Sequence, residues 1–525
     1  MMSQANQQSA GVKIKKNEAF AVAAERLVPE LFHEVCRPQH LMKVIADEEA
    51  VHGWRTEAVG PADNLQALVL GKGDEVILDF GKHLVGKLSF HIVPDGSPPD
   101  APLYLKVTLG EMPVEMGEAF AEYNGWLSRS WLQEETCHLD VLPHTLHMER
   151  RYSFRYLKLQ VIDTSVKYKV IFDDVYCTTV TSASPERLVP LKHPDEELGR
   201  IDEVSIRTLK DCMQEVFEDG PKRDRRLWLG DLRLQALANY ETFKNYDLVK
   251  RCLYLFAAYP TDKGLISANL FMKPVVIPDD TYLFDYSLFF VATLSDYYEA
   301  TQDMDTLREL WPTAFRQIEL SLERLDARDI VQDDETWWAF IDWKDQLSKV
   351  ASAQAILIYN MKSALRLAAI LEDHNQEFLQ VRIEQLTAAA LQFLWSDKLH
   401  CFVSGEQQQI SWASQIWMIL AGVLDEGKGR ELLVRLLEEK PGLSLTTPYM
   451  MHHLIEALIQ VGERERAAQE IKNYWGQMIK DGADTFWELY DPGDKNFSPY
   501  GSYLINSYCH AWSCTPSYFI RKYHL

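Results

Sequence analysis

The segment 219–231, DGPKRDRRLWLGD, concentrates side chains that could do chemistry. It holds three carboxylates, four basic side chains, a tryptophan and two glycines, directly after an amphipathic segment. Charged groups this close lose water as they approach, so they stay together only when they orient one another or a polyhydroxylated ligand. The pattern therefore predicts a site, and the chemistry that it favours is the cleavage of a carbohydrate.

The aspartates of this segment also have a purely structural interpretation. Asp219, Asp224 and Asp231 could be helix caps and ion-pair partners of the neighbouring arginines at the start of a helix. Asp231 is compatible with both interpretations, since a residue that caps a helix can also contact a ligand.

The chain around this segment shows two kinds of apolar periodicity, one typical of strands and one typical of helices. From about residue 65 to about residue 180, apolar residues occupy every second position, as in Leu103, Leu105 and Val107, and turn residues separate the runs. This alternation predicts an antiparallel β-sandwich. The run GKHLVGK at 81–87 resembles a phosphate-binding loop, but Leu88 replaces the required Ser or Thr and a strand follows, which argues against nucleotide binding.

After Pro190 the apolar period becomes that of helices. Twelve helices are predicted, and they begin near residues 198, 231, 247, 281, 304, 352, 376, 411, 428, 449, 463 and 501. Connections after the odd-numbered helices are long, whereas those after the even-numbered helices are short. Antiparallel helices would then form six hairpins, an (α/α)6 barrel with every long loop on one rim. We expect function on that rim.

The sequence thus predicts a multidomain α and β protein in three parts. Residues 1–50 would form an N-terminal segment with a short helix, residues 51–190 the β-sandwich domain, and residues 191–525 the (α/α)6-barrel catalytic domain. The rim loops would carry Asp279, Trp343, Trp487 and Glu488 in addition to the charged segment.

Composition limits the partners. The net charge of −23 argues against nucleic acid or an anionic membrane surface as a partner, whereas a neutral small molecule is unaffected. No long apolar run and no signal-peptide core is found, so we expect a cytoplasmic protein. The eight cysteines show no CxxC pair or zinc spacing, which predicts reduced, mostly buried thiols and no metal. A homodimer would suit such a compact acidic chain.

Several motifs in their correct order resemble those of one family. Segment 219–231 resembles the D-C-P-x-R-(D)-E-R-L-G-W-x-G-D signature of the inverting α-L-rhamnosidases of glycoside hydrolase family 78. GADTFWELYD at 482–491 resembles the family's G-A-T-T-x-W-E motif, and CHAWS at 509–513 its C-H-G-W-S stretch. The dipeptide at 342–343 lies where the family carries G-D-W. The resemblance spans about residues 65–525.

The resemblance implies roles for individual residues. Asp224 would be the general acid and Glu488 the general base, because glycoside hydrolysis needs one protonated carboxyl group and one carboxylate that activates water. No cofactor would be needed. The other residues implied as lining the sugar pocket, with Asp279 and Trp487 added from the rim loops, are Asp219, Arg223, Trp228, Asp231, Trp343 and His510.

Some of these residues have structural alternatives. His510 could be a satisfied core histidine, Trp228 and Trp343 could belong to the barrel core, and Asp279 could cap a helix. The sequence also departs from the family pattern. Asp224 replaces the usual Glu, Gly220 the usual Cys, and Leu227 a common Gly. A glycosidase of other specificity, or a non-catalytic sugar-binding protein, therefore stays an alternative to a rhamnosidase.

Overall fold

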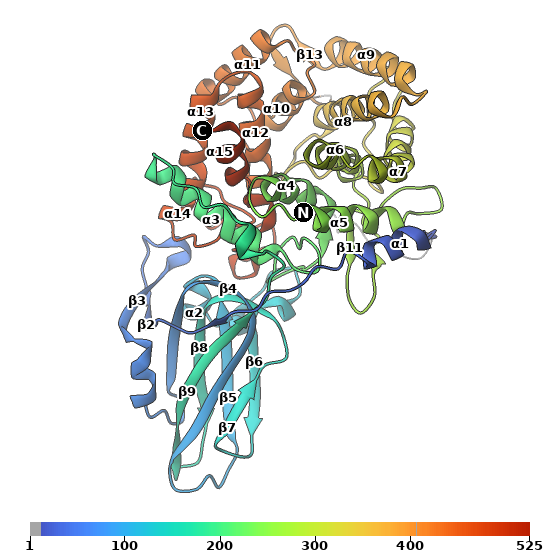
Figure 1. Ribbon diagram of the computed structural model, residues 1–525. Helices are drawn as coiled ribbons and strands as arrows, with labels where there is room; N and C mark the ends of the chain where they lie inside the picture. Colours follow the sequence, from blue (N-terminus) through green and yellow to red (C-terminus); the bar gives the residue numbers. More distant parts are fainter. Residues whose placement is uncertain (1–11, 406) are drawn as a thin grey trace.

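The computed structural model describes residues 12–405 and 407–525. An antiparallel sheet domain, drawn from blue to cyan, lies below a larger helical domain, drawn from green to red (Figure 1). Both parts of the predicted fold are confirmed.

The sheet domain is a two-layer sandwich, and one long strand, β4, contributes to both layers. The first half of β4 pairs with β2 and β8, and after an irregularity between Asp79 and Leu84 its second half pairs mainly with β7 and β9. The strands are β1 (Val35–Cys36), β2 (His40–Ala46), β3 (Trp54–Pro61), β4 (Glu75–Gly96), β5 (Leu103–Gly110), β6 (Glu134–Leu139), β7 (His144–His147), β8 (Tyr152–Asp163) and β9 (Tyr168–Thr179). β1 and β2 lie within the predicted N-terminal segment and pair with this sheet.

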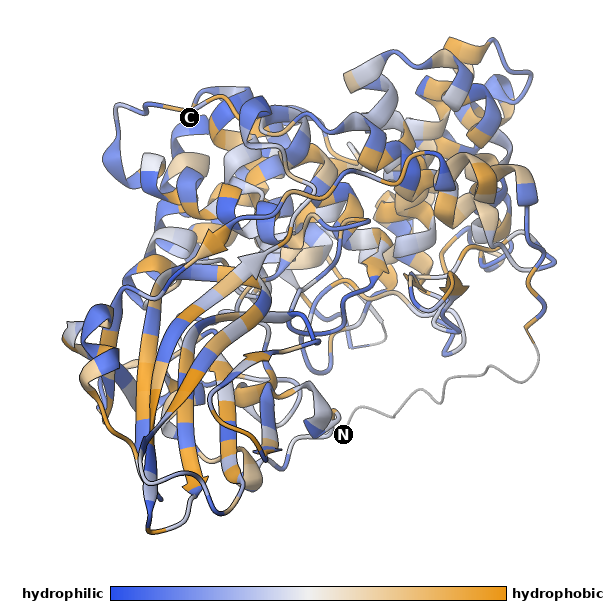
Figure 2. Ribbon diagram, turned by 60° about the horizontal axis from the view of Figure 1, so that its bottom comes forward, coloured by the Kyte–Doolittle hydropathy of each residue, from blue (hydrophilic) through white to orange (hydrophobic). Residues whose placement is uncertain are grey.

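Alternation along the strands builds the sandwich core. Leu103, Leu105 and Val107 are fully buried, as the sequence predicted, and Figure 2 shows the resulting stripes of apolar and polar residues. Opposite faces of a strand take alternate side chains, so one face of each layer packs inward. The segment 81–87 forms part of β4 and not a phosphate-binding loop.

The helices form two concentric rings. The inner ring consists of α4 (Leu229–Glu241), α6 (Phe284–Thr301), α8 (Val350–Leu371), α10 (Trp412–Leu420), α12 (Pro448–Gln460) and α15 (Pro516–Tyr523). The outer ring consists of α3 (Glu196–Cys212), α5 (Tyr246–Ala258), α7 (Met304–Leu322), α9 (Gln376–Phe393), α11 (Glu426–Glu439) and α13 (Arg464–Ile471), which α14 (Gln477–Lys480) extends.

The inner ring closes on itself. Each inner helix contacts the next, His452 of α12 packs on Phe519 of α15 at 4.9 Å between ring centroids, and α15 contacts α4. Inner helices are therefore covered on all sides, which explains why most residues of α4 and α6 are buried, polar ones included.

The connections alternate as predicted. Long segments lead into the inner helices, and short turns lead back out to the outer ring, so the long segments lie at one end of the barrel. The long segments are 213–228, 259–283, 323–349, 394–411, 440–447 and 481–515. The short turns are 242–245, 302–303, 372–375, 421–425 and 461–463.

The predicted twelfth helix near residue 501 is wrong. Residues there form only a 3-10 turn, Tyr503–Ile505, and the last helix begins at Pro516. The carbonyl oxygens of Leu504, Ile505 and Asn506 instead accept hydrogen bonds from side chains of segment 213–228. A continuous helix would have used those carbonyls for its own backbone bonds.

Two further expectations concern exposure to membrane and solvent. In residues 12–405 and 407–525, no helix combines the length and the apolar character needed to cross a membrane. The eight cysteines are free thiols, and all except Cys137 are buried, as predicted.

Candidate active site

The charged segment forms a closed loop between α3 and α4. The amide of Asp219 donates to the carbonyl of Arg226, and the amide of Arg226 donates back to Oδ1 of Asp219, both at 3.0 Å. Arg225 takes the left-handed conformation with φ of 61°. Leu227 and Trp228 then pair as β10 (Leu227–Trp228) with β11 (Asn269–Phe271), which fixes the entry into α4.

Arg223 lies at the centre of the site. Its guanidinium is buried, and Nη2 donates to Oε2 of Glu488 while Nε donates to the carbonyl of Ile505 at 3.2 Å. The ring of Tyr500 lies 4.4 Å from the guanidinium carbon. Burial opposes the charge of Arg223, but the neighbouring acidic groups, Glu488 foremost, together outweigh burial and raise the pKa of Arg223. The side chain therefore stays a cation.

Glu488 accepts hydrogen bonds at both oxygens. Besides Arg223, the hydroxyl of Tyr500 donates to Oε1, and the amide of Ser507 donates to Oε2 at 3.4 Å. The side chain is 4% exposed. Charge-assisted bonds of this kind are short and fix the orientation of the carboxylate. The Glu488 carboxylate is thus held in one orientation and is nearly desolvated.

Asp224 lies on the other side of the same guanidinium. Its Oδ1 is 3.7 Å from Nη1 of Arg223, and its side chain is 20% exposed. One cation therefore separates the two carboxyl groups, and Asp224 is the more accessible of them.

Asp231 and His510 form a second buried pair beside this centre. Oδ1 of Asp231 lies 3.1 Å from Nε2 of His510, and the imidazole packs 4.4 Å from the ring of Trp512. Burial raises the pKa of Asp231, which His510 opposes. In the described part of the chain, neither Asp231 Oδ1 nor either ring nitrogen of His510 makes a well-aligned hydrogen bond. Buried polar groups normally have partners, so these atoms are available to a ligand.

Aromatic rings surround the two polar pairs. Trp228 meets Tyr286 edge-on at 6.2 Å, and Trp343 contacts Phe340 at 5.3 Å and Tyr500 at 5.8 Å. The indole N–H groups of Trp228 and Trp343 are buried and have no acceptor among the described residues. Both rings are partly exposed, which fits contact with a ligand better than a place in the barrel core.

Two of the predicted residues do not join this cluster. The ring of Trp487 is 3% exposed and packs against Tyr490 and Tyr508 at 5.6 and 5.4 Å, so it supports the loop from within. Asp279 accepts from Asn269 at 2.8 Å and lies 3.5 Å from Arg226, in a network that braces the charged loop.

Asp219 begins the charged loop and ties it to a neighbouring segment. It is buried, and its carbonyl accepts from the amide of Ala511 at 2.7 Å, which ties the charged loop to the CHAWS segment. Burial raises the pKa of the Asp219 carboxyl well above its usual range, and the charges of Asp224 and Asp231 add to this effect.

Sequence reasoning missed several aromatic members of the site. Tyr500 orients Glu488, Tyr286 and Phe340 pack against the tryptophans, and Tyr449 contacts Trp512. Only Tyr500 carried a sequence signal, because it directly follows the long rim loop that ends at Pro499.

The sheet domain holds the charged loop through Lys222. This side chain is fully buried, and its ammonium donates to Oε1 of Glu115 at 2.7 Å and to the carbonyls of Leu504 and Asn506 at 3.1 and 3.0 Å. Glu115 belongs to α2 (Val114–Gly117), which follows β5. The loop that carries Asp224 is therefore anchored in both domains.

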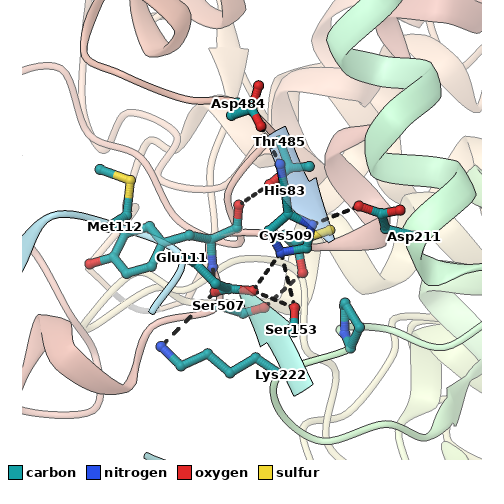
Figure 3. A network of polar contacts seen from close by, with 12 residues as sticks. His83, Glu111, Met112, Ser153, Asp211, Lys222, Asp484, Thr485, Ser507 and Cys509 are labelled. Atoms are coloured by element: carbon teal, nitrogen blue, oxygen red, sulfur yellow. Dashed lines mark hydrogen bonds and ion pairs between the residues drawn. The ribbon is translucent and has the colours of Figure 1, made fainter. Parts of the chain in front are cut away.

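The same network continues to His83 (Figure 3). Its Nδ1 lies 2.6 Å from Asp211 and its Nε2 3.1 Å from Glu111, and its backbone amide donates to Asp484 at 2.5 Å. Glu111 in turn accepts from the amide of Tyr508 at 2.8 Å. The sheet, α3 and segment 481–515 thus meet at one buried histidine.

Two groups of side chains in the described residues have the spacing of metal ligands. One is His83, Asp211 and Cys509, and the other is His452, His453 and Glu456. Both nitrogens of His83 already face hydrogen-bonding partners, and Arg233 lies 3.4 Å from Glu456. A neighbouring guanidinium disfavours a second cation. We therefore assign a hydrogen-bonding role to the first group, whereas the second lies beside a buried guanidinium.

The site lies at one end of an (α/α)6 barrel and holds two carboxyl groups on either side of a guanidinium, with a buried Asp–His pair and aromatic rings beside them. This arrangement is that of a glycoside hydrolase. The chain belongs to the bacterial alpha-L-rhamnosidases of glycosyl hydrolase family 78. The profile of the family's N-terminal domain matches residues 38–179, and that of the bacterial alpha-L-rhamnosidase 6 hairpin glycosidase domain matches residues 190–523.

Solved structures agree with this assignment. A rhamnosidase from Klebsiella oxytoca, with rhamnose bound, is 50% identical and superimposes with a TM-score of 0.96 over 98% of this chain and 100% of its own. The family 78 rhamnosidase of Bacillus sp. GL1 shares the fold at 22% identity and a TM-score of 0.73, over 90% of this chain and 50% of its own. A search of curated proteins gave no match.

Replacement of Lys222 by Met tests the anchoring of the charged loop. The variant leaves Glu115 as a buried charge without its partner, so we expect a loss of about 3–5 kcal/mol in the free energy of unfolding. Lys87→Met at an exposed position should cost less than about 1 kcal/mol. Urea unfolding measures both. Wild-type stability of Lys222→Met would contradict the anchoring role, and the double variant with Glu115→Gln should regain part of the loss.

Replacement of Asp219 by Asn tests the raised pKa of this carboxyl. A folded-state pKa above the unfolded value of about 3.9 means that the native state holds the proton more tightly, so its contribution to stability is lost as pH rises. Asp219→Asn should therefore gain on the order of 1 kcal/mol at neutral pH and flatten the fall in melting temperature as the pH rises above about 4. The exposed Asp63→Asn serves as control. An unchanged pH profile would contradict the prediction.

Proposed function

We propose that this glycoside hydrolase releases terminal α-L-rhamnose from small rhamnosides or oligosaccharides with inversion of configuration, with Asp224 as general acid and Glu488 as general base. The observation that carries the proposal is that two side chains donate hydrogen bonds to the carboxylate of Glu488. Arg223 and Tyr500 each donate to one of its oxygens, which fixes the orientation that a general base needs toward its water molecule.

The position of the two carboxyl groups supports inversion. Asp224 precedes α4 and Glu488 precedes α15, and these are neighbouring helices of the inner ring. The groups therefore approach from separate loops with a guanidinium between them. An inverting enzyme needs room for a water molecule between the base and the sugar, with carboxyl groups about 6.5–9.5 Å apart.

The remaining residues would bind the sugar. Asp231 and His510 offer its hydroxyl groups polar atoms that make no well-aligned hydrogen bond, and Trp228 and Trp343 offer an indole N–H and an apolar face. The methyl group of a 6-deoxy sugar suits such a face. Arg223 would orient Glu488, and Asp219 would tie the charged loop to Ala511 through its backbone carbonyl. A relative with half of its residues identical was solved with rhamnose bound, which supports this sugar.

The proposed mechanism needs no metal or organic cofactor. Asp224 donates its proton to the leaving oxygen as the glycosidic bond breaks, and Glu488 takes a proton from the attacking water, so charge and atoms balance. A cytoplasmic location and a homodimer stay predictions.

A panel of 4-nitrophenyl glycosides tests the proposal. The α-L-rhamnoside should be hydrolysed at a kcat/KM at least about tenfold above every other sugar, since hydroxyl positions that match a buried hydrogen-bonding site discriminate strongly. Preference for another sugar would replace the substrate, and no hydrolysis of any would favour a sugar-binding protein.

Replacement of Asp224 by Asn tests the role of the acid. Aglycones that leave as poor alkoxides need protonation, whereas nitrophenolate needs little, so activity on an alkyl rhamnoside should fall about 10²–10⁴-fold and activity on the nitrophenyl rhamnoside much less. Asp494→Asn, in an exposed turn, serves as control. Equal losses on both substrates would count against Asp224 as the acid.

A further inference from the structure

Trp126 is an exposed tryptophan beside the candidate active site. It lies between β5 and β6 of the sheet domain, and 57% of its surface is exposed. Its indole ring presents a large apolar face to solvent, which a ligand ring can cover.

The helical domain holds Trp126 in place. Its backbone amide donates to the carbonyl of Tyr500 at 3.0 Å, and its indole Nε1 donates to the carbonyl of Pro499 at 2.9 Å. Its ring lies 5.7 Å from the ring of Tyr500, tilted by 56°. Two hydrogen bonds therefore fix an exposed ring before any ligand arrives, which lowers the entropy cost of binding.

Trp126 continues an aromatic arc that starts at the barrel rim. Tyr500 contacts Trp343 on one side and Trp126 on the other, and its hydroxyl donates to Glu488. Burial raises the pKa of Tyr500, and the charge of Glu488, to which its hydroxyl donates, adds to this effect. Trp126 is thus one ring away from the proposed chemistry.

Exposure distinguishes the two ends of the arc. The unpaired polar atoms of Asp231, His510 and Trp228 are buried, as a site for the cleaved sugar requires. Trp126 lies at the open end, where the group that leaves must reach solvent. The ligand suited to an exposed indole is a flat ring with an apolar face, which an aryl group or a pyranose provides.

We propose that Trp126 is the stacking platform for the ring of the aglycone, so that the sheet domain supplies part of the substrate site. This inference rests on the proposed rhamnosidase function. It predicts that the enzyme selects rhamnosides whose aglycone begins with an aryl or pyranose ring over those with a small alkyl aglycone.

The test compares Trp126→Ala and Trp126→Phe with wild type on three substrates: 4-nitrophenyl α-L-rhamnoside, an α-L-rhamnosyl-glucose disaccharide, and methyl α-L-rhamnoside. Trp126→Ala should lower kcat/KM about 3- to 10-fold, mainly through KM, on one or both ring aglycones and leave the methyl glycoside unchanged. Trp126→Phe should restore most of the loss. The affected substrate tells whether the platform takes an aryl group or a sugar.

Two controls separate binding from structure. Val166→Ala, at a fully exposed position in the turn between β8 and β9, should change nothing, and inhibition by free L-rhamnose should be the same in all variants. Equal losses on all three substrates, or no loss on any, would overturn the platform alone. No hydrolysis by wild type would overturn the proposed function and this inference with it.

Discussion

The buried guanidinium of Arg223 is the constraint on which the site depends. It donates hydrogen bonds to Glu488 and to the carbonyl of Ile505, and it lies against the ring of Tyr500. A buried cation is tolerated only when its partners are fixed around it, because each loses its hydration. The loop before α4 and the loop before α15 must therefore keep one relative position, and this requirement explains why segment 481–515 is not a helix.

The sheet domain also helps to keep the two loops in one relative position. Lys222 precedes Arg223 in the chain and points into a buried cage that includes Glu115 of the sheet domain and carbonyls of the helical domain. His83 adds a second junction with α3. The two domains therefore act as one unit, in which the sandwich positions the loop that carries the proposed acid.

Much of this architecture could be predicted from the sequence. Periods of two and of 3.6 residues give the strands and helices, and the alternation of long and short connections gives the rim, because these depend only on which faces are buried. The density of charge at 219–231 located the central loop. Family motifs then linked it to Glu488 and His510, which are more than 250 residues away in the chain.

The parts that could not be predicted depend on tertiary contacts. Nothing in the sequence shows that Trp487 packs against Tyr490 and Tyr508, or that Tyr500 joins Trp343 to the sheet domain. The departures from the family pattern also have local causes. A Cβ at Gly220 would lie 2.6 Å from the carbonyl oxygen of Arg223 and 2.8 Å from Oγ of Ser507, and Leu227 is buried where β10 pairs with β11. Such fits are set by neighbours that are distant in sequence.

The central claim is that Glu488, oriented by Arg223 and Tyr500, activates a water molecule on the face of the sugar opposite to Asp224. Proton NMR of a fresh digest of an α-L-rhamnoside, recorded before mutarotation, tests this claim most directly. The account predicts that the released sugar is first seen as the β anomer. First appearance of the α anomer would mean retention through a covalent intermediate, and would contradict the assignment of Glu488 as a base.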